Sequence, residues 1–204
     1  KNLTAALPQE LTVLLRQAIK PSKQTRMRAL STLQAKVASS SLPPSDSSNS
    51  ASSSSSSSST TYTQPQLRSL VQHYAPAFKT LQNDDDRHVR EAAATTLSIL
   101  SKQVKLYKPA LSSTLSDLSF PWWTAMHDTA REVSRAANDA FMNAFPGENK
   151  QNAATLFSAP YVTDAAIEYL TTAIPTSSAG SNEITEITIL RRKYASIIAL
   201  KSLL

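Results

Sequence analysis

The chain has 204 residues, no cysteine, only two glycines and a formal net charge of +6. A chain of this length can bury a sizeable core in one or two domains. The lack of cysteine excludes disulfides, a cysteine-ligated zinc site and a thiol nucleophile, and fits a cytosolic or nuclear protein. No run of about 18 apolar residues occurs, so no transmembrane helix is predicted. The first residue is Lys1 and the last, Leu204, ends an apolar helical pattern. We therefore interpret residues 1–204 as part of a longer protein.

Two helices are predicted before the first low-complexity stretch. Leu3–Lys20 has leucines on one side, Pro21 ends it, and Ser22 caps a second helix. Together they form an antiparallel pair, the unit of an α-solenoid. The side chains expected to face the core of this pair are Leu7, Leu11, Leu14, Leu15, Met27, Leu30, Leu33 and Val37.

The stretch Ser39–Thr63 is of low complexity and includes eight consecutive serines, Ser52–Ser59. It has almost no apolar residue to bury, so nothing offsets the entropy of ordering it. We expect a disordered surface loop inside the domain. Its serines are either phosphorylation sites or filler of variable length, and the composition favours filler.

Further helices are expected along the rest of the chain. A helix over Gln64–Gln82 has a possible kink at Pro76, and another runs from the acidic turn Asn83–Asp86 to about Val104. After these come predicted helices at Tyr107–Leu118, at Asp128–Phe145, at Glu148–Ser158, at Tyr161–Ile174 beyond a break at Pro160, and at Glu183–Leu204. The segment Ile184–Leu190 also suits a strand, but no partner strand is in sight.

The stretch Leu118–Phe145 contains the strongest packing signal. Pro121-Trp122-Trp123 is expected to lie at the start of a helix capped by Asp128, with Val133 and Phe141 on its apolar stripe. Each tryptophan can bury roughly 150–250 Å², so Trp122 and Trp123 are interpreted as core anchors. An exposed stacking platform for peptides or bases is the alternative.

A sequence pattern repeats within the chain. Arg87-His88-Val89 matches Arg131-Glu132-Val133 at a spacing of 44 residues, and Leu97 matches Phe141 at the same spacing. Two-helix units of about 40–47 residues are typical of HEAT and armadillo repeats. The predicted fold is therefore all-α, a HEAT-like or armadillo-like α-solenoid of stacked antiparallel hairpins.

No catalytic constellation is visible. His73, His88 and His127 are far apart in the sequence, and none has metal-ligand spacing. His127-Asp128 could be half a triad, but a helix cap explains Asp128 better. Asp84-Asp85-Asp86 could bind a cation, although acids at a helix N-terminus need none. No glycine-rich phosphate loop occurs.

Basic residues are clustered. Between Glu10 and Asp46 the sequence contains cations and no acid. A basic face attracts a phosphate backbone, and without a base-reading motif any RNA contact would be to that backbone. A solvated face without a partner is the other reading. The candidate docking residues are Arg16, Lys20, Lys23, Arg26, Arg28, Arg191, Arg192 and Lys193.

Three motifs together resemble a known family. Asp84–Glu91, then Pro121-Trp122-Trp123, then Arg131-Glu132-Val133 with Phe145-Pro146 look like the N-terminal domain of listerin, the E3 ubiquitin ligase of ribosome-associated quality control. The opening Leu14–Leu33 also resembles that family. The likeness extends over most of residues 7–160 and fades beyond them.

This resemblance implies a function for the parent protein. Such a ligase is cytosolic, engages large (60S) ribosomal subunits obstructed by a nascent chain, and ubiquitinates that chain through a C-terminal RING domain. The RING domain with its zinc and the ubiquitin-conjugating enzyme it recruits must lie outside this cysteine-free chain, in which we expect no cofactor. The resemblance implies that these residues dock on the large subunit and on the companion factor that recognises it. A generic HEAT scaffold for another protein is the competing interpretation, and an enzyme is a third that no motif favours.

Overall fold

The computed structural model describes residues 6–40, 62–171 and 183–203, and every regular element in these ranges is a helix. The all-α prediction is therefore confirmed, and Ile184–Leu190 is helical rather than a strand. None of these helices combines the length and the apolar character needed to cross a membrane. The elements are α1 Gln9–Ala18, α2 Lys23–Ser39, α3 Gln64–Leu81, α4 Arg87–Gln103, the short 3-10 helix η1 Pro109–Leu111, α5 Ser112–Met126, α6 Arg131–Ala144, α7 Glu148–Thr171 and α8 Glu183–Lys201.

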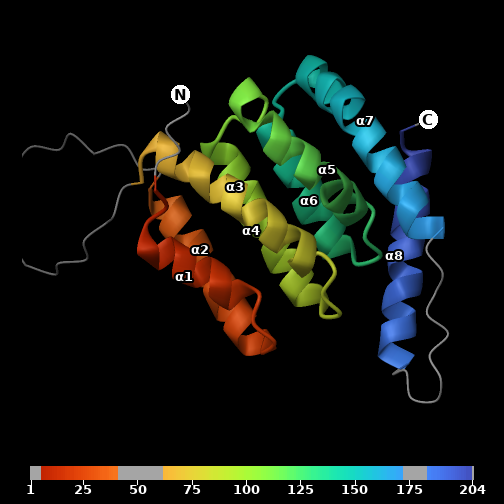
Figure 1. Ribbon diagram of the computed structural model, residues 1–204, viewed down its shortest axis with the longest axis horizontal. Coiled ribbons are helices and arrows are strands. Elements are labelled where there is room, and N and C mark those ends of the chain that lie inside the picture. Colours follow the sequence, from red (N-terminus) through yellow and green to blue (C-terminus); the bar gives the residue numbers. More distant parts are fainter. Residues whose placement is uncertain (1–5, 41–61, 172–182, 204) are drawn as a thin grey trace, which may run out of the picture.

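The helices are arranged in two layers of stacked hairpins (Figure 1). Helices α2, α4 and α6 pack side by side in one layer, and α1, α3, α5 and α7 pack in the other. The chain thus repeats a helical hairpin three times and then adds α7 and α8. Helix α8 packs on α7 and α5, so it does not extend the layer of α2, α4 and α6.

Local capping contacts mark the starts of three helices, α2, α3 and α4. Ser22 accepts a hydrogen bond from the Thr25 N–H at the start of α2, and Asp86 accepts one from the His88 N–H at the start of α4. Gln66 accepts the N–H of Thr63 at the start of α3, at 2.9 Å. The first helix begins later than predicted, at Gln9, because Pro8 disfavours helical backbone in the residue before it.

The prediction for the tryptophan motif was wrong in its local structure. Pro121, Trp122 and Trp123 lie inside α5, which continues to Met126 instead of ending at Leu118. Helix α6 begins at Arg131 rather than at Asp128, and Asp128 lies in the turn before it. The helix continues through Pro121 because the buried surface of both indole rings outweighs one lost backbone hydrogen bond.

Both indole rings lie in the core, where the sequence pattern places at least one of them. Trp122 is 1% exposed and Trp123 is 5% exposed, and both pack edge-to-face on Phe141 of α6 at 5.9 and 5.3 Å between ring centroids. The Trp122 Nε1–H donates to the carbonyl of Ala137 at 3.0 Å, so the polar end of that ring is satisfied. Val133 on the same helix is fully buried.

The prediction of two helices separated at Pro160 was also wrong. Helix α7 is continuous from Glu148 to Thr171, with Pro160 exposed inside it. The break predicted after Phe145 is correct, because α6 ends at Ala144 and Gly147 adopts a φ of 91°. Of the serine-rich stretch Ser39–Thr63, residues 41–61 lie outside the described residues.

Candidate docking surface and its ion pairs

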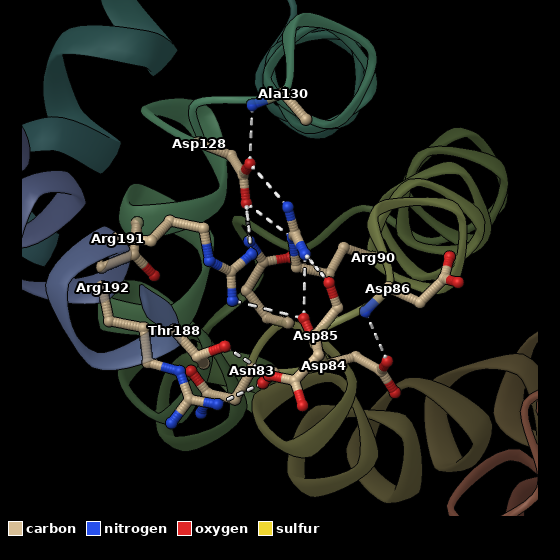
Figure 2. A network of polar contacts seen from close by, with 12 residues as sticks. Asn83, Asp84, Asp85, Asp86, Arg90, Asp128, Ala130, Thr188, Arg191 and Arg192 are labelled. Atoms are coloured by element: carbon tan, nitrogen blue, oxygen red, sulfur yellow. Dashed lines mark hydrogen bonds and ion pairs between the residues drawn. The ribbon is translucent and has the colours of Figure 1, made fainter. Parts of the chain in front are cut away.

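A buried arginine on α4 joins two successive hairpins. Arg90 donates through Nε and Nη2 to the two carboxylate oxygens of Asp128, at 2.9 and 3.1 Å (Figure 2). Its Nη1 donates to the backbone carbonyls of Asp84 and Asp85. The side chains of Arg90 and Asp128 are 4% and 5% exposed. Because Asp128 lies in the turn between α5 and α6, this pair ties α4 to the next hairpin.

The same arrangement occurs one hairpin earlier. Arg26, the fourth residue of α2, forms an ion pair with Asp84 at 2.9 Å, as Arg90, the fourth residue of α4, does with Asp128. Its Nη1 donates to the carbonyls of Lys20 and Pro21, six and five residues earlier, which is the offset of the carbonyls bound by Arg90. We call the pairs Arg26–Asp84 and Arg90–Asp128 the two rungs.

The two rung aspartates also act alike within their own turns. Asp84 accepts the N–H of Asp86 at 2.9 Å, and Asp128 accepts the N–H of Ala130 at 2.8 Å. They are 44 residues apart, which is the spacing predicted from the sequence repeat. The acids at these turns therefore fix the start of the following helix and hold the preceding hairpin.

Sequence reasoning missed the rungs for an identifiable reason. Arg26 and Arg90 are 64 residues apart, 20 more than the repeat, because the serine-rich stretch lies between them. The pairs Ala29–Ala93 and Leu33–Leu97 share this spacing of 64 residues. With the insertion removed, a search at a period of 44 residues would have found a third copy of the unit.

Helix α8 reaches the same turns from the opposite side. Arg191 lies 3.5 Å from the Asp128 carboxylate and donates to the Asp84 carbonyl at 3.2 Å, and Arg192 donates to the Asn83 carbonyl (Figure 2). Thr188 donates to the carboxylate of Asp85. Burial lowers the pKa of Arg191, the positive charges of Arg90 and Arg192 lower it further, and Asp128 and Asp85 oppose this.

The structure divides the candidate docking residues into two groups. Arg26 and Lys23 are neutralised by Asp84 and Asp86, and the Lys23 ammonium holds the pKa of Asp86 below its usual range. No acid lies close to Lys23 and Arg26 in the sequence, as expected. In the folded chain, however, Asp84 and Asp86 of the next hairpin lie beside them and neutralise their charge. Arg191 and Arg192 bind the turns described above, and Lys193 donates to the Leu170 carbonyl at 3.3 Å.

Three cations at the turn between α1 and α2 stay exposed. Arg16, Lys20 and Arg28 have no acidic side chain within ion-pair distance in the described residues. Arg28 also lines a polar depression of about 220 Å³ together with Gln17, Gln24 and Thr25. We call Arg16, Lys20 and Arg28 the basic turn, the part of the predicted docking surface whose charge remains available.

The histidines and acids singled out in the sequence have structural partners. Asp128 binds Arg90, while the ring of His127 bonds the Ser202 hydroxyl at 3.0 Å. His73 bonds the Ser69 carbonyl at 2.7 Å. Across the described ranges, no three histidine or acidic side chains are grouped as metal ligands. Asp84, Asp85 and Asp86 instead bind Arg26, Thr188 and Lys23.

Stacked helical hairpins, joined by arginine–aspartate rungs, define an all-α protein built from repeated helical hairpins. The family model of the N-terminal domain of the E3 ubiquitin-protein ligase listerin matches residues 7–203. The chain therefore belongs to that family, and the match extends well past residue 160, where the resemblance was expected to fade. A search of curated proteins and a search of solved structures each found no match.

Proposed function

We propose that this chain is the docking domain of a listerin-like RING E3 ubiquitin ligase that acts in ribosome-associated quality control. In this proposal the parent protein ubiquitinates nascent chains stalled on large ribosomal subunits in the cytosol. The RING domain, its zinc and the conjugating enzyme would lie elsewhere in the parent. The observation that carries the proposal is the family match over residues 7–203.

The basic turn supports a role in docking on the large subunit. Arg16, Lys20 and Arg28 present positive charge that no acid in the described residues neutralises. Ribosomal RNA offers a dense row of phosphates, and cation–phosphate contacts release counterions on binding. The companion quality-control factor would bind another face of the same domain.

The experiment is a charge reversal that leaves the rungs intact. Arg16, Lys20 and Arg28 are changed together to glutamate, and binding to purified large subunits is measured over a series of salt concentrations. We expect weaker binding and a flatter dependence of log affinity on log salt, because each lost phosphate contact reduces the slope. Reversing Arg26 would be a poor test, since it would place a carboxylate against Asp84.

The control reverses three exposed cations, Lys102 in the last turn of α4 and Lys105 and Lys108 in the segment that follows it. This control has the same change in net charge, so it separates local contact from general electrostatics. Subunit binding that survives reversal of the basic turn at physiological salt would overturn the assignment of this surface.

A generic protein scaffold is the second candidate. It is favoured by exposed apolar side chains on α7 and α8, among them Leu156, Ile167 and Ile197. Exposed apolar groups of this kind are frequent at protein interfaces. Capture of proteins, without capture of large subunits in the presence or absence of the companion factor, would support it.

A further inference from the structure

A cavity of about 320 Å³ lies where α8 meets α3, α5 and α7. One part of its wall is apolar and includes Phe120, Pro121 and Tyr169. The rings of Phe120 and Tyr169 are 6.3 Å apart and tilted by 50°. Another part of the wall carries the cations Lys79, Arg191 and Arg192. A ligand that fills this cavity must therefore offer an apolar group beside negative charge.

Two polar groups in the wall lack a partner in the described residues. Gln82 is 5% exposed, and its buried Oε1 has no hydrogen-bond donor. The Nε–H of Arg192 is buried without an acceptor. Leaving a buried donor or acceptor without a partner is unfavourable, so both groups favour a ligand that can bond them. A peptide unit could satisfy both groups, because its N–H can donate to Gln82 Oε1 and its carbonyl can accept from the Arg192 Nε–H. A phosphodiester has no N–H that could donate to Gln82.

The charges around the cavity favour an anion. Three cations line it against two acids, Asp128 and Glu168. Asp128 is already bound by Arg90 and Arg191, and with that pair set aside the wall still carries two cations, Lys79 and Arg192, against one acid, Glu168. Burial and then the neighbouring arginines lower the pKa of Arg191, which a bound carboxylate would reverse.

We propose that this cavity binds an acidic peptide segment of a partner protein, with an apolar side chain against Phe120 and Tyr169 and a neighbouring carboxylate facing Arg192 and Lys79. This site is separate from the basic turn and does not depend on ribosome binding. A partner that enters it bridges α8 to the end of α3 and so closes the C-terminal end of the hairpin stack.

The test uses the 204-residue chain and a fluorescein-labelled peptide, Gly-Asp-Glu-Leu-Asp-Glu-Gly, with binding followed by fluorescence anisotropy. Two control peptides replace the leucine by glycine or the acids by asparagine and glutamine. We expect Arg192→Glu to weaken binding about tenfold or more, as reversal of a contacting charge does. Tyr169→Ala should weaken it, and Arg192→Lys should weaken it less than Arg192→Glu does, because lysine keeps the positive charge but lacks the Nε–H. Arg131→Glu, an exposed residue of α6, serves as the matched control.

Backbone NMR of the unchanged chain gives a readout that does not depend on any variant folding. Peptide addition should shift the amide signals of Gln82, Tyr169 and Arg192 and leave those of the basic turn unmoved. The proposal would be overturned if Arg192→Glu bound the peptide as tightly as the unaltered chain does. It would also be overturned if the leucine-free or the uncharged peptide bound as tightly as the original peptide, or if the amide signals that shift were confined to Arg16–Arg28. Displacement of the peptide from the cavity by oligouridylate at low concentration would assign the site to RNA instead.

Discussion

Arg90 joins three parts of the chain through one side chain. It binds the carboxylate of Asp128 and the carbonyls of the turn before its own helix. A buried ion pair adds little net stability compared with a well-packed apolar pair, but breaking one leaves an uncompensated charge. Removing one partner is therefore expected to destabilise the hairpin stack, because the other charge stays buried.

We predict that Arg90→Met lowers the free energy of unfolding by about 3 kcal/mol, the lower end of the range for broken buried pairs. We expect a loss at the lower end of that range because Asp128 keeps a cationic partner in this variant. Arg191 stays 3.5 Å from its carboxylate. Urea denaturation measures the effect. Arg87→Met, an exposed change on the same helix, should stay within about 0.5 kcal/mol of the unaltered chain. If both variants unfold at the same urea concentration, the rung has no role in stability.

The two tryptophans should differ in the cost of removal. Trp122→Ala loses a fully packed ring and the hydrogen bond to Ala137, so we expect a loss near the top of the range of roughly 3–5 kcal/mol. Trp123→Ala should cost less, because that ring makes no hydrogen bond in the described contacts and is slightly more exposed. A larger loss for Trp123, measured by the same denaturation, would contradict this ranking.

At the scale of the element, the interior prolines follow a pattern. Pro76, Pro121 and Pro160 lie inside α3, α5 and α7, which share one layer, while α4 and α6 in the other layer contain none. Each proline removes a backbone hydrogen bond and crowds the preceding turn. Among the described helices, interior prolines are therefore confined to the layer of α1, α3, α5 and α7 and do not occur in the layer of α2, α4 and α6.

Pro160→Ala should raise the free energy of unfolding, by up to about 3 kcal/mol, because alanine restores the helix hydrogen bond and the side chain is exposed. Thermal and urea unfolding measure the gain. Pro121→Ala is the comparison, and its gain should be smaller because buried Pro121 also contributes packing. Destabilisation by Pro160→Ala would show that α7 needs a bend there to pack on α5.

The sequence predicted the helix boundaries best where a local signal marks them. The starts at Gln64 and Arg87 follow local signals, such as Asp86 accepting the His88 N–H. The continuation of α5 through Pro121 and of α7 through Pro160 depends on packing between helices. A short segment of sequence carries no information about that packing. The rungs also depend on contacts between distant residues. Arg26 and Asp84 are 58 positions apart, and Arg90 and Asp128 are 38 positions apart, so a local reading of the sequence does not pair them.

At the scale of the whole molecule, the long serine-rich stretch lies between hairpins and not within one. It connects Ser40, at the end of α2, to Tyr62, just before α3. The rungs and the stacking of α2 on α4 are made entirely by residues outside it. We therefore expect its length to have little effect on which residues pair.

Deleting the 16 residues Ser45–Thr60 should change the melting temperature by no more than a few degrees, since loop-closure entropy varies by only about 0.6 kcal/mol for each doubling of length. Differential scanning calorimetry measures this. Deleting the single residue Asp85 is the control, and it should destabilise far more because it shifts Asp84 relative to Arg90. A large drop for the long deletion would mean that the segment packs on the domain.

The rungs also make the stack mechanically uneven. Every described ion pair between side chains of different hairpins lies at the edge formed by the turns before α2, α4 and α6. At the other edge, the ion pair Lys36–Glu10 lies within one hairpin and joins no neighbours. A load that separates neighbouring hairpins would therefore open the edge that carries Lys102, Lys105 and Lys108, with the ion-paired edge acting as the hinge axis. We therefore expect the curvature of the hairpin stack to change more easily by opening that edge than by opening the ion-paired one.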